Sequence, residues 1–409
     1  MNDPLEDLMG DQPNVTGANI ATLRKAAGLT QEQLADRVNV SKSLLSKVEI
    51  GDRAATHALV AAVARVLRLP IERIHGQPYS GSDVEEAHGE IDALRTALRV
   101  YDLPPTNGTV TSKALDGLRA DVATVTQLRR SGRYTHLGQR LPPLLAELGA
   151  AVHTHTGADR RTLFELLTAA YYAAHGLAHR LGYGDLAESI EHKLAWAAQG
   201  ADDPLAIGLA GWTRVTSFQD AGDYDHGLQI LDQASSQVRV STADPAAPAT
   251  IAVLGSMHLR AATLASRAGD SSETRDQLDA ARALAEAFPA DQRHYQLTFG
   301  PANVAIHATA AYVELGHPAE AVRLSERFAP PADIAPTRAG HHYIDLARAH
   351  LATGDRHAAL GDLQHARTVA PEQTRHHPMV RETTRVLISL HRRSNPDLTQ
   401  LASWLGLTI

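Results

Sequence analysis

The chain has 409 residues, a net charge of −7 and no cysteine. Its length allows two or three domains with sizeable cores. The lack of cysteine excludes disulfides, thiolate catalysis and cysteine-based zinc sites, and it is compatible with a reducing, cytoplasmic location. No segment approaches the roughly 18 uninterrupted apolar residues that a membrane span needs, so we expect no membrane contact. Residues 1–16 are acidic and carry no apolar run, and we expect a disordered tail.

The charge is distributed unevenly along the chain. Residues 17–76 hold nine Lys and Arg against five Asp and Glu, a balance of +4, and the rest of the chain carries the remaining −11. Only this N-terminal segment therefore has the electrostatics to approach a phosphate backbone. We expect the acidic remainder to stay off DNA and to hold partners of its own.

A helix is predicted over about residues 18–27, followed within residues 30–53 by a helix, a tight turn and a second helix. Thr30 and Gln33 have the spacing of a capping box, which predicts where the first helix of this pair begins. Asn39 tolerates the left-handed conformation that lets the chain leave a helix abruptly. The segment is therefore expected to fold as two helices joined by a sharp turn.

The second helix of the pair follows Ser41, which can cap it, and buries Leu45 and Val48 at three-residue spacing. Its outer face is left with Lys42, Ser43, Leu44 and Lys47. Lysine can donate to guanine O6 and N7, serine to several base edges, and an exposed leucine can contact a thymine methyl group. These four side chains are the predicted base-reading residues.

Phosphate contacts are expected on both sides of this helix, from the backbone amides near Thr30 and Gln31 and from Arg53. The complete predicted DNA-binding set is Thr30, Gln31, Ser41, Lys42, Ser43, Leu44, Lys47 and Arg53. The alternative for this stretch is an ordinary amphipathic helical hairpin with solvated lysines.

The pattern LTQEQLADRVNVSKSLLSKVEIGDR, preceded by IATLRKAAG, resembles the Xre or lambda-repressor-like helix-turn-helix family over about residues 17–76. The resemblance implies a five-helix DNA-binding domain, with further helices over THALVAAVARVLRL and PIERIHG. It also implies an ion pair between Arg24 on the first helix and Glu49 at the end of the recognition helix. Asn39 departs from the glycine that is commoner at this turn, although asparagine can supply the same turn conformation.

Residues 77–155 are predicted to be a hinge followed by linker helices. The segment QPYSGSD at 77–83 is rich in turn formers and indicates the hinge. Helical periodicity predicts helices over about 84–100, 113–130 and 133–153, the last kinked at its paired prolines. The prolines and the Asn-Gly within 101–112 predict a loop.

Residues 156–409 contain a repeat. A glycine followed by a polar turn recurs after Ala-rich helices, at Gly182, Gly222, Gly269, Gly316 and Gly354. The intervals of 40, 47, 47 and 38 residues exceed the roughly 34 of an ideal tetratricopeptide repeat, so insertions such as VSTADPAAPA and FPADQRHYQ are expected in the turns. The fifth unit resembles that family best, through Tyr343, Leu346, Ala347, Gly354, Ala359, Leu363, Ala366 and Pro371. The fold class is therefore predicted to be all-α, with a tetratricopeptide-like solenoid capped by helices near 378–393 and 396–405.

The first helix of each unit should line the concave face of such a solenoid, forming a long groove. The register of the five glycines predicts that a mixed aromatic, amide and charged set points into it. Its members are Tyr172, Trp212, Thr216, Arg260, Asn303, His307, His341, Asp345 and Arg348. This set suits a peptide or an extended polar small molecule. For each residue alone, a solvated groove wall is the simpler interpretation.

The combined architecture resembles the peptide-sensing RRNPP regulators of Gram-positive bacteria, and the Ala-rich, lysine-poor composition resembles that of actinobacterial regulators. The resemblance implies a peptide held by several groove asparagines, but the predicted groove offers Asn303 only. A peptide is therefore one ligand option among several.

Histidine is abundant, with 22 residues, but no acidic residue is spaced to complete a zinc site around His175 and His179, or around His341 and His342. We expect no metal, no cofactor and no enzymatic activity, because phosphate-binding loops and nucleophile motifs are also missing. The predicted function is a homodimeric, ligand-responsive transcription factor that binds an operator in double-stranded DNA. The alternatives are a protein-interaction scaffold localised by its DNA-binding domain, and a hydrolase or phosphatase regulator that works without DNA.

Overall fold

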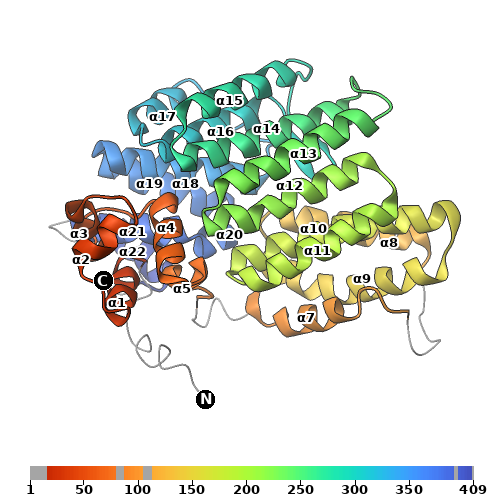
Figure 1. The fold of residues 1–409 in the computed structure, drawn as a ribbon, viewed down its shortest axis with the longest axis horizontal. Helices are drawn as coiled ribbons and strands as arrows, with labels where there is room; N and C mark the ends of the chain where they lie inside the picture. The colour runs from red at the N-terminus through yellow and green to blue at the C-terminus, as the bar shows by residue number, and fades with distance from the viewer. Residues whose placement is uncertain (1–15, 80–86, 105–112, 391–394, 408–409) are drawn as a thin grey trace.

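The computed structural model describes residues 16–79, 87–104, 113–390 and 395–407. These residues are helical apart from turns and one two-stranded hairpin, so the predicted all-α class is confirmed (Figure 1). The tail expected over residues 1–16 lies outside the described residues except for Thr16, which already begins the first helix. Within the described ranges, every helix is too short or too polar to cross a bilayer.

Five helices form the N-terminal domain, as predicted. They are α1 (Thr16–Ala26), α2 (Gln31–Arg37), α3 (Lys42–Ile50), α4 (His57–Leu67) and α5 (Ile71–His75). Each contributes apolar side chains to one core, with Ile20, Leu34, Leu45, Val60 and Ile74 at its centre. Because each helix is short, this shared core rather than helix propensity stabilises the domain.

Three helices follow the N-terminal domain, namely α7 (Ile91–Arg99), α8 (Leu115–Arg130) and α9 (Tyr134–Thr154). The predicted helix over 84–100 is thus seen from Ile91, and most of the predicted 101–112 loop lies outside the described residues. The apolar faces of α7, α8 and α9 share one hydrophobic core with the helices that come next. They therefore pack as part of the solenoid rather than as a separate linker.

Helix pairs build the rest of the chain. They are α10 (Gly157–Leu181) with α11 (Gly184–Ala201), α12 (Pro204–Ala221) with α13 (Tyr224–Ser241), α14 (Pro248–Ala268) with α15 (Ser271–Ala285), α16 (Pro301–Glu314) with α17 (Pro318–Ser325), and α18 (Pro336–Thr353) with α19 (Arg356–Val369). The five predicted turn glycines follow the first helix of each pair, with φ between +69° and +90°. Such angles favour glycine, because a side chain would clash there. The predicted solenoid of helix pairs is confirmed.

Three helices close the chain, α20 (Pro371–His376), α21 (Pro378–Leu390) and α22 (Pro396–Leu405). The sequence analysis expected the last two and missed α20, whose six residues are too short to show a helical period. Trp404 on α22 lies against the last pair, as expected, with the guanidinium of Arg367 4.7 Å from its ring centre.

An antiparallel hairpin of β1 (Gln292–His294) and β2 (Leu297–Phe299), which begins inside a predicted insertion, was not expected from the sequence. Strands of three residues are too short to show the alternation of a strand. The hairpin packs on α14 at Gly255, where an added Cβ atom would lie 2.0 Å from the ring of Phe299. The glycine thus makes room for a fully buried aromatic ring.

The two ends of the solenoid touch. At the end of α8, the carbonyl of Arg130 accepts a hydrogen bond from Thr337 at 2.9 Å. At the start of α9, the Thr135 amide donates to Glu372 at 2.9 Å. On the first helix pair, Arg180 lies 2.6 Å from the ring nitrogen of His341 on the last pair. The first and last helix pairs of the solenoid are therefore in contact. The prediction of a long open groove is wrong.

Candidate nucleic-acid interface

Local hydrogen bonds fix the α2–turn–α3 unit. The Thr30 hydroxyl accepts from the Gln33 amide at 3.1 Å, and the Gln33 side chain accepts from the Thr30 amide at 2.8 Å. Asn39 has φ of +56° at the turn, and the Ser41 hydroxyl accepts from the Leu44 amide at 3.1 Å. Each of these short-range signals lies where the sequence pattern indicated, so the geometry of the unit is encoded locally.

A buried ion pair ties α1 to α3. The Arg24 guanidinium donates twice to the Glu49 carboxylate, at 2.6 and 2.8 Å, and once to the Leu29 carbonyl at 2.8 Å. The two side chains are only 8% and 3% exposed, and the hydrogen bond to Glu49 raises the pKa of Arg24. The side-chain amide of Gln31 donates to the same carboxylate at 2.8 Å. This network holds α3 at a fixed angle to α1 and α2.

The predicted base-reading residues lie on the outer face of α3. Lys42, Ser43 and Lys47 are exposed. Lys42 has a single weak contact to Glu32 at 3.5 Å, and both side chains are more than half exposed, so the ammonium group remains available. Leu44 corrects the expectation of a bare leucine, because it is half-buried against the core of the domain.

The predicted phosphate-contacting residues differ in whether they have a hydrogen-bond donor that is still available. Arg53 is exposed just beyond the end of α3, and Ser41 is exposed at its cap. The Thr30 amide is already satisfied by Gln33, which corrects its assignment as a phosphate donor. The Gln31 side chain is bound to Glu49, so only its backbone amide could reach a phosphate.

The opposite side of the N-terminal domain is docked on the solenoid. The Ala55 amide donates to Glu382 of α21 at 3.0 Å, and the Ser389 hydroxyl of the same helix donates to the Gly51 carbonyl at 2.8 Å. On α4, Arg65 donates to the Gly222 carbonyl at 3.3 Å. Figure 1 shows α2 and α3 at the edge of the molecule, far from α10 to α15. The candidate reading surface therefore faces outward while the back of the domain is held.

This docking contact was not predicted, because the helix near 378–393 was expected only to cap the solenoid. The Arg381 guanidinium lies 3.8 Å from the ring centre of Tyr79, which is 4% exposed, and Gln77 donates to the His376 carbonyl at 3.4 Å. The described part of the predicted 77–83 hinge is thus packed against the solenoid. The available signal was the group of charges at Arg381, Glu382 and Arg385 within this helix.

Four of the nine predicted ligand-binding residues form one cluster inside the solenoid. The rings of Tyr172 and Trp212 are 6.1 Å apart. The Arg260 guanidinium lies 4.7 Å from the Trp212 ring centre and donates to the Thr216 hydroxyl at 2.7 Å. Cation–π contact and hydrogen bonding together hold this arginine in one orientation.

The other five residues are divided between separate places. His341 contacts Arg180, and His307 lies 3.5 Å from the Thr263 hydroxyl. Arg348 donates to Asp345 at 2.9 Å and to Glu314 at 2.8 Å, forming a largely buried ion-pair network.

Asn303 is the one predicted groove asparagine, and its side chain is bonded to the hairpin instead. It is 2% exposed and donates to the Thr298 carbonyl of the hairpin at 2.8 Å. An asparagine engaged in this way is not free to hold a peptide backbone. This corrects its assignment as a ligand-binding residue.

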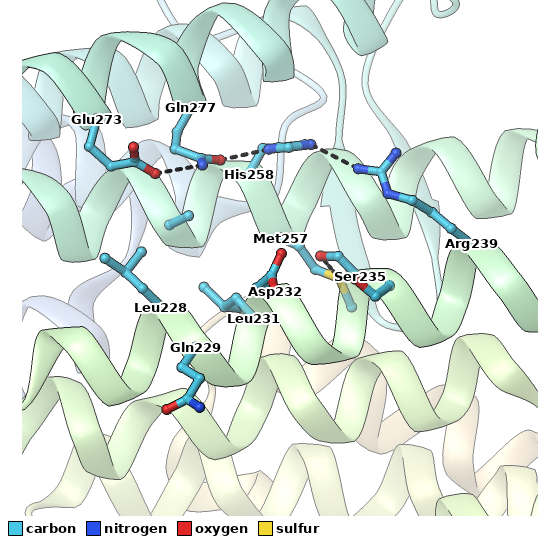
Figure 2. Close-up of a pocket in the computed structure, with 12 residues that line it drawn as sticks. Leu228, Gln229, Leu231, Asp232, Ser235, Arg239, Met257, His258, Glu273 and Gln277 are labelled. Atoms are coloured by element: carbon cyan, nitrogen blue, oxygen red, sulfur yellow. Dashed lines mark hydrogen bonds between the residues drawn. The ribbon is translucent and has the colours of Figure 1, made fainter.

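A separate cavity of about 400 Å³ lies between α13, α14 and α15 (Figure 2). Along its rim, the ring of His258 lies 3.4 Å from Arg239 and 2.6 Å from Gln277, which in turn donates to Glu273 at 2.8 Å. Met257 contributes to its apolar floor. None of the nine predicted ligand-binding residues lines this cavity, which sequence reasoning did not find.

Two of the four histidines first weighed as metal ligands are paired with acids. His175 lies 3.2 Å from Glu191, and His179 lies 2.9 Å from Asp220. The Ser217 hydroxyl also donates to Glu191 at 3.0 Å. Burial raises the pKa of Glu191 to about 8 and lowers the pKa of His175 to about 3.

This buried pair predicts a decline in stability with rising pH. Because the pKa of Glu191 is higher in the folded state than in the unfolded chain, its contribution to stability is lost as the pH rises towards 8. Because the pKa of His175 is lower in the folded state, its contribution is lost only as the pH falls below 6.5. Between about pH 6.5 and 8 only the first effect operates, so the free energy of unfolding should fall by roughly 1.4 kcal/mol per pH unit. Urea denaturation at pH 6.5 and at pH 8 measures this fall in the free energy of unfolding. Glu191→Gln, which cannot ionise, should lose that part of the dependence, and an unchanged slope would contradict the assignment.

Comparison with known proteins gives the class of the N-terminal domain. Residues 17–75 match a family model described as a helix-turn-helix domain. The chain therefore carries a helix-turn-helix domain at its N-terminus, and α3, with its exposed basic face, is the second helix of that unit. No curated protein sequence matches the chain.

Several solved structures resemble the helical architecture at low identity. PlcR of Bacillus thuringiensis, solved with the peptide PapR7 and DNA, is 14% identical, with 67% of this chain and 95% of that chain covered and a TM-score of 0.29. BtubC of P. vanneervenii is 13% identical, with 68% and 96% covered and a TM-score of 0.34. The competence regulator ComR of Streptococcus vestibularis in its apo form is 11% identical, with 67% and 93% covered and a TM-score of 0.22. These TM-scores are too low for the whole chains to share one arrangement.

Proposed function

We propose that the chain is a sequence-specific transcriptional regulator that acts as a homodimer in the cytoplasm, and that its tetratricopeptide-like solenoid senses a small molecule or peptide. The observation that carries the DNA-binding part is the outward position of Lys42, Ser43 and Lys47 on a helix whose other face is buried. A helix presenting such residues fits the major groove and can read base edges there.

Dimerisation is proposed from the size of the reading unit. One helix-turn-helix domain covers only a few base pairs, so useful affinity needs two domains on half-sites about one helical turn apart. The acidic solenoid supports DNA contact through the N-terminal domains alone, because the solenoid should not bind the phosphate backbone.

A footprint of the purified full chain on the DNA upstream of its own coding sequence tests the proposal. The expected result is a protected region with two half-sites related by two-fold symmetry. Protection without symmetry would count against the dimer, and no protection at any salt concentration up to physiological would count against operator binding.

The ligand-sensing part is supported by contacts that run from the solenoid interior to the reading domain. His57 of α4 lies 4.0 Å from Glu314, which accepts from Arg348, one of the predicted ligand-binding residues. A ligand that binds the docked and undocked arrangements with different affinity would shift the balance between them. Its effect on the operator would then follow from how freely two reading domains can reach their half-sites.

Glu382 offers a test of the docking contact itself. Glu382→Leu removes the acceptor of the Ala55 amide and leaves that buried donor unsatisfied, which should weaken docking by about 1–3 kcal/mol. Glu382→Gln keeps an acceptor oxygen and serves as the matched control. Hydrogen–deuterium exchange over residues 51–55 should become faster in the leucine variant only. Equal exchange in the two variants would show that this hydrogen bond does not hold the domain.

A further inference from the structure

Four arginines from different helices lie in one region of the solenoid interior, two of them against the Tyr172–Trp212 ring pair, and we name the four the interior arginine cluster. They are Arg129 of α8, Arg180 of α10, Arg260 of α14 and Arg338 of α18. Arg129 lies 4.6 Å from the Tyr172 ring centre, and Arg260 lies 4.7 Å from the Trp212 ring centre. Arg338 lies one helical turn before His341, which contacts Arg180. The positive charges of Arg129 and Arg180 both act on the guanidinium of Arg338.

The acidic side chains of the interior are engaged with other groups. Asp220 accepts from His179, and both Glu314 and Asp345 accept from Arg348. Glu191 accepts from Ser217, and Asp291 accepts from two backbone amides at the start of α16. Among the residues that the structure describes, none of the four clustered arginines forms an ion pair with a carboxylate.

Guanidinium groups that lie close together inside a protein repel one another. Burial, together with the charges of Arg129 and Arg180, lowers the pKa of Arg338. Burial also lowers the pKa of Arg260, to about 10. All four residues are nevertheless of intermediate exposure, so they are mostly covered by protein but not fully buried. Such an arrangement is costly unless an anion enters it.

We infer that the interior arginine cluster binds an oxyanionic effector, a ligand carrying at least two phosphate or carboxylate charges. The inference rests on the ligand-sensing role proposed above and names the chemistry of the ligand. Guanidinium groups bind phosphate and carboxylate oxygens through pairs of parallel hydrogen bonds. Stacking on the Tyr172 and Trp212 rings holds two of these groups in place before a ligand arrives, which reduces the entropy lost on binding.

Thermal unfolding of the full chain with two probes tests the site. Sodium tripolyphosphate and sodium citrate represent the phosphate and carboxylate forms of the ligand, and sodium chloride at equal ionic strength is the reference. At least one probe should raise the Tm saturably above the chloride reference. Arg338→Gln should lose that rise, yet without any probe it should unfold at or above the wild-type Tm because a repulsive charge is gone.

Arg214→Gln is the matched control, since Arg214 is an exposed arginine on α12 outside the cluster, and it should keep the full rise. Arg180→Gln is a second cluster variant, which can still donate to His341 and should behave like Arg338→Gln. A rise with tripolyphosphate alone or with citrate alone supports the site and identifies the form of the oxyanion. Equal rises in the wild type and the cluster variants, or a rise that chloride reproduces, would overturn the inference.

The operator footprint separates this site from the proposed function. If the probe binds through the cluster but leaves the footprint unchanged at saturation, the anion site stands and its role in controlling the operator fails. If the footprint is two-fold symmetric but neither probe raises the Tm above chloride, DNA binding stands and the anion site fails.

Discussion

Lys42→Ala and Lys47→Ala are each expected to weaken operator binding by about 1–3 kcal/mol, or roughly 5- to 150-fold. Both ammonium groups lie on the outer face of α3, where they can donate to guanine in the major groove. Because the two side chains are exposed and make at most one weak contact, the Tm of each variant should stay close to wild type. Titration of the footprinted operator at one fixed salt concentration measures the loss.

Lys25→Ala is the matched control for charge, because Lys25 is also exposed but lies in the last turn of α1 rather than on α3. It should change operator affinity much less than either α3 variant. Loss of affinity that is equal for all three substitutions, and equal on unrelated DNA, would mean that the lysines act only through net charge. In that case the assignment of α3 as the reading helix would be wrong.

Arg24→Met should destabilise the reading domain by about 3–5 kcal/mol. The substitution leaves the Glu49 carboxylate buried with only the Gln31 amide as a partner and removes the bond to the Leu29 carbonyl. A loss of this size is a large share of the stability of a typical small domain. Urea denaturation followed by a probe in residues 17–76 measures it, and operator binding should fall in parallel because α3 loses its fixed angle.

The double variant Arg24→Met with Glu49→Leu is the control for this interpretation. Removing both charges replaces a buried ion pair by apolar groups, which is often close to neutral for stability. The double variant should therefore be more stable than Arg24→Met alone. If the two variants were equally unstable, lost packing rather than the unpaired carboxylate would be the cause.

The sequence by itself determined the local architecture. The Thr30–Gln33 capping box, the left-handed Asn39 and the cap at Ser41 act over four residues or fewer, so their geometry does not depend on the rest of the chain. The repeated turn glycines act in the same way, since a left-handed residue ends a helix wherever the helix packs. These signals were sufficient to predict the α2–turn–α3 unit and the series of helix pairs.

Only the tertiary structure decided how these parts meet. The bond from Ala55 to Glu382 joins residues 327 positions apart, and the contact of Arg180 with His341 spans 161 positions. No periodic pattern encodes such pairings, because they depend on the summed curvature of all the helix pairs between them. The same curvature closed the expected groove and brought four arginines together without an ion pair to a carboxylate among the described residues.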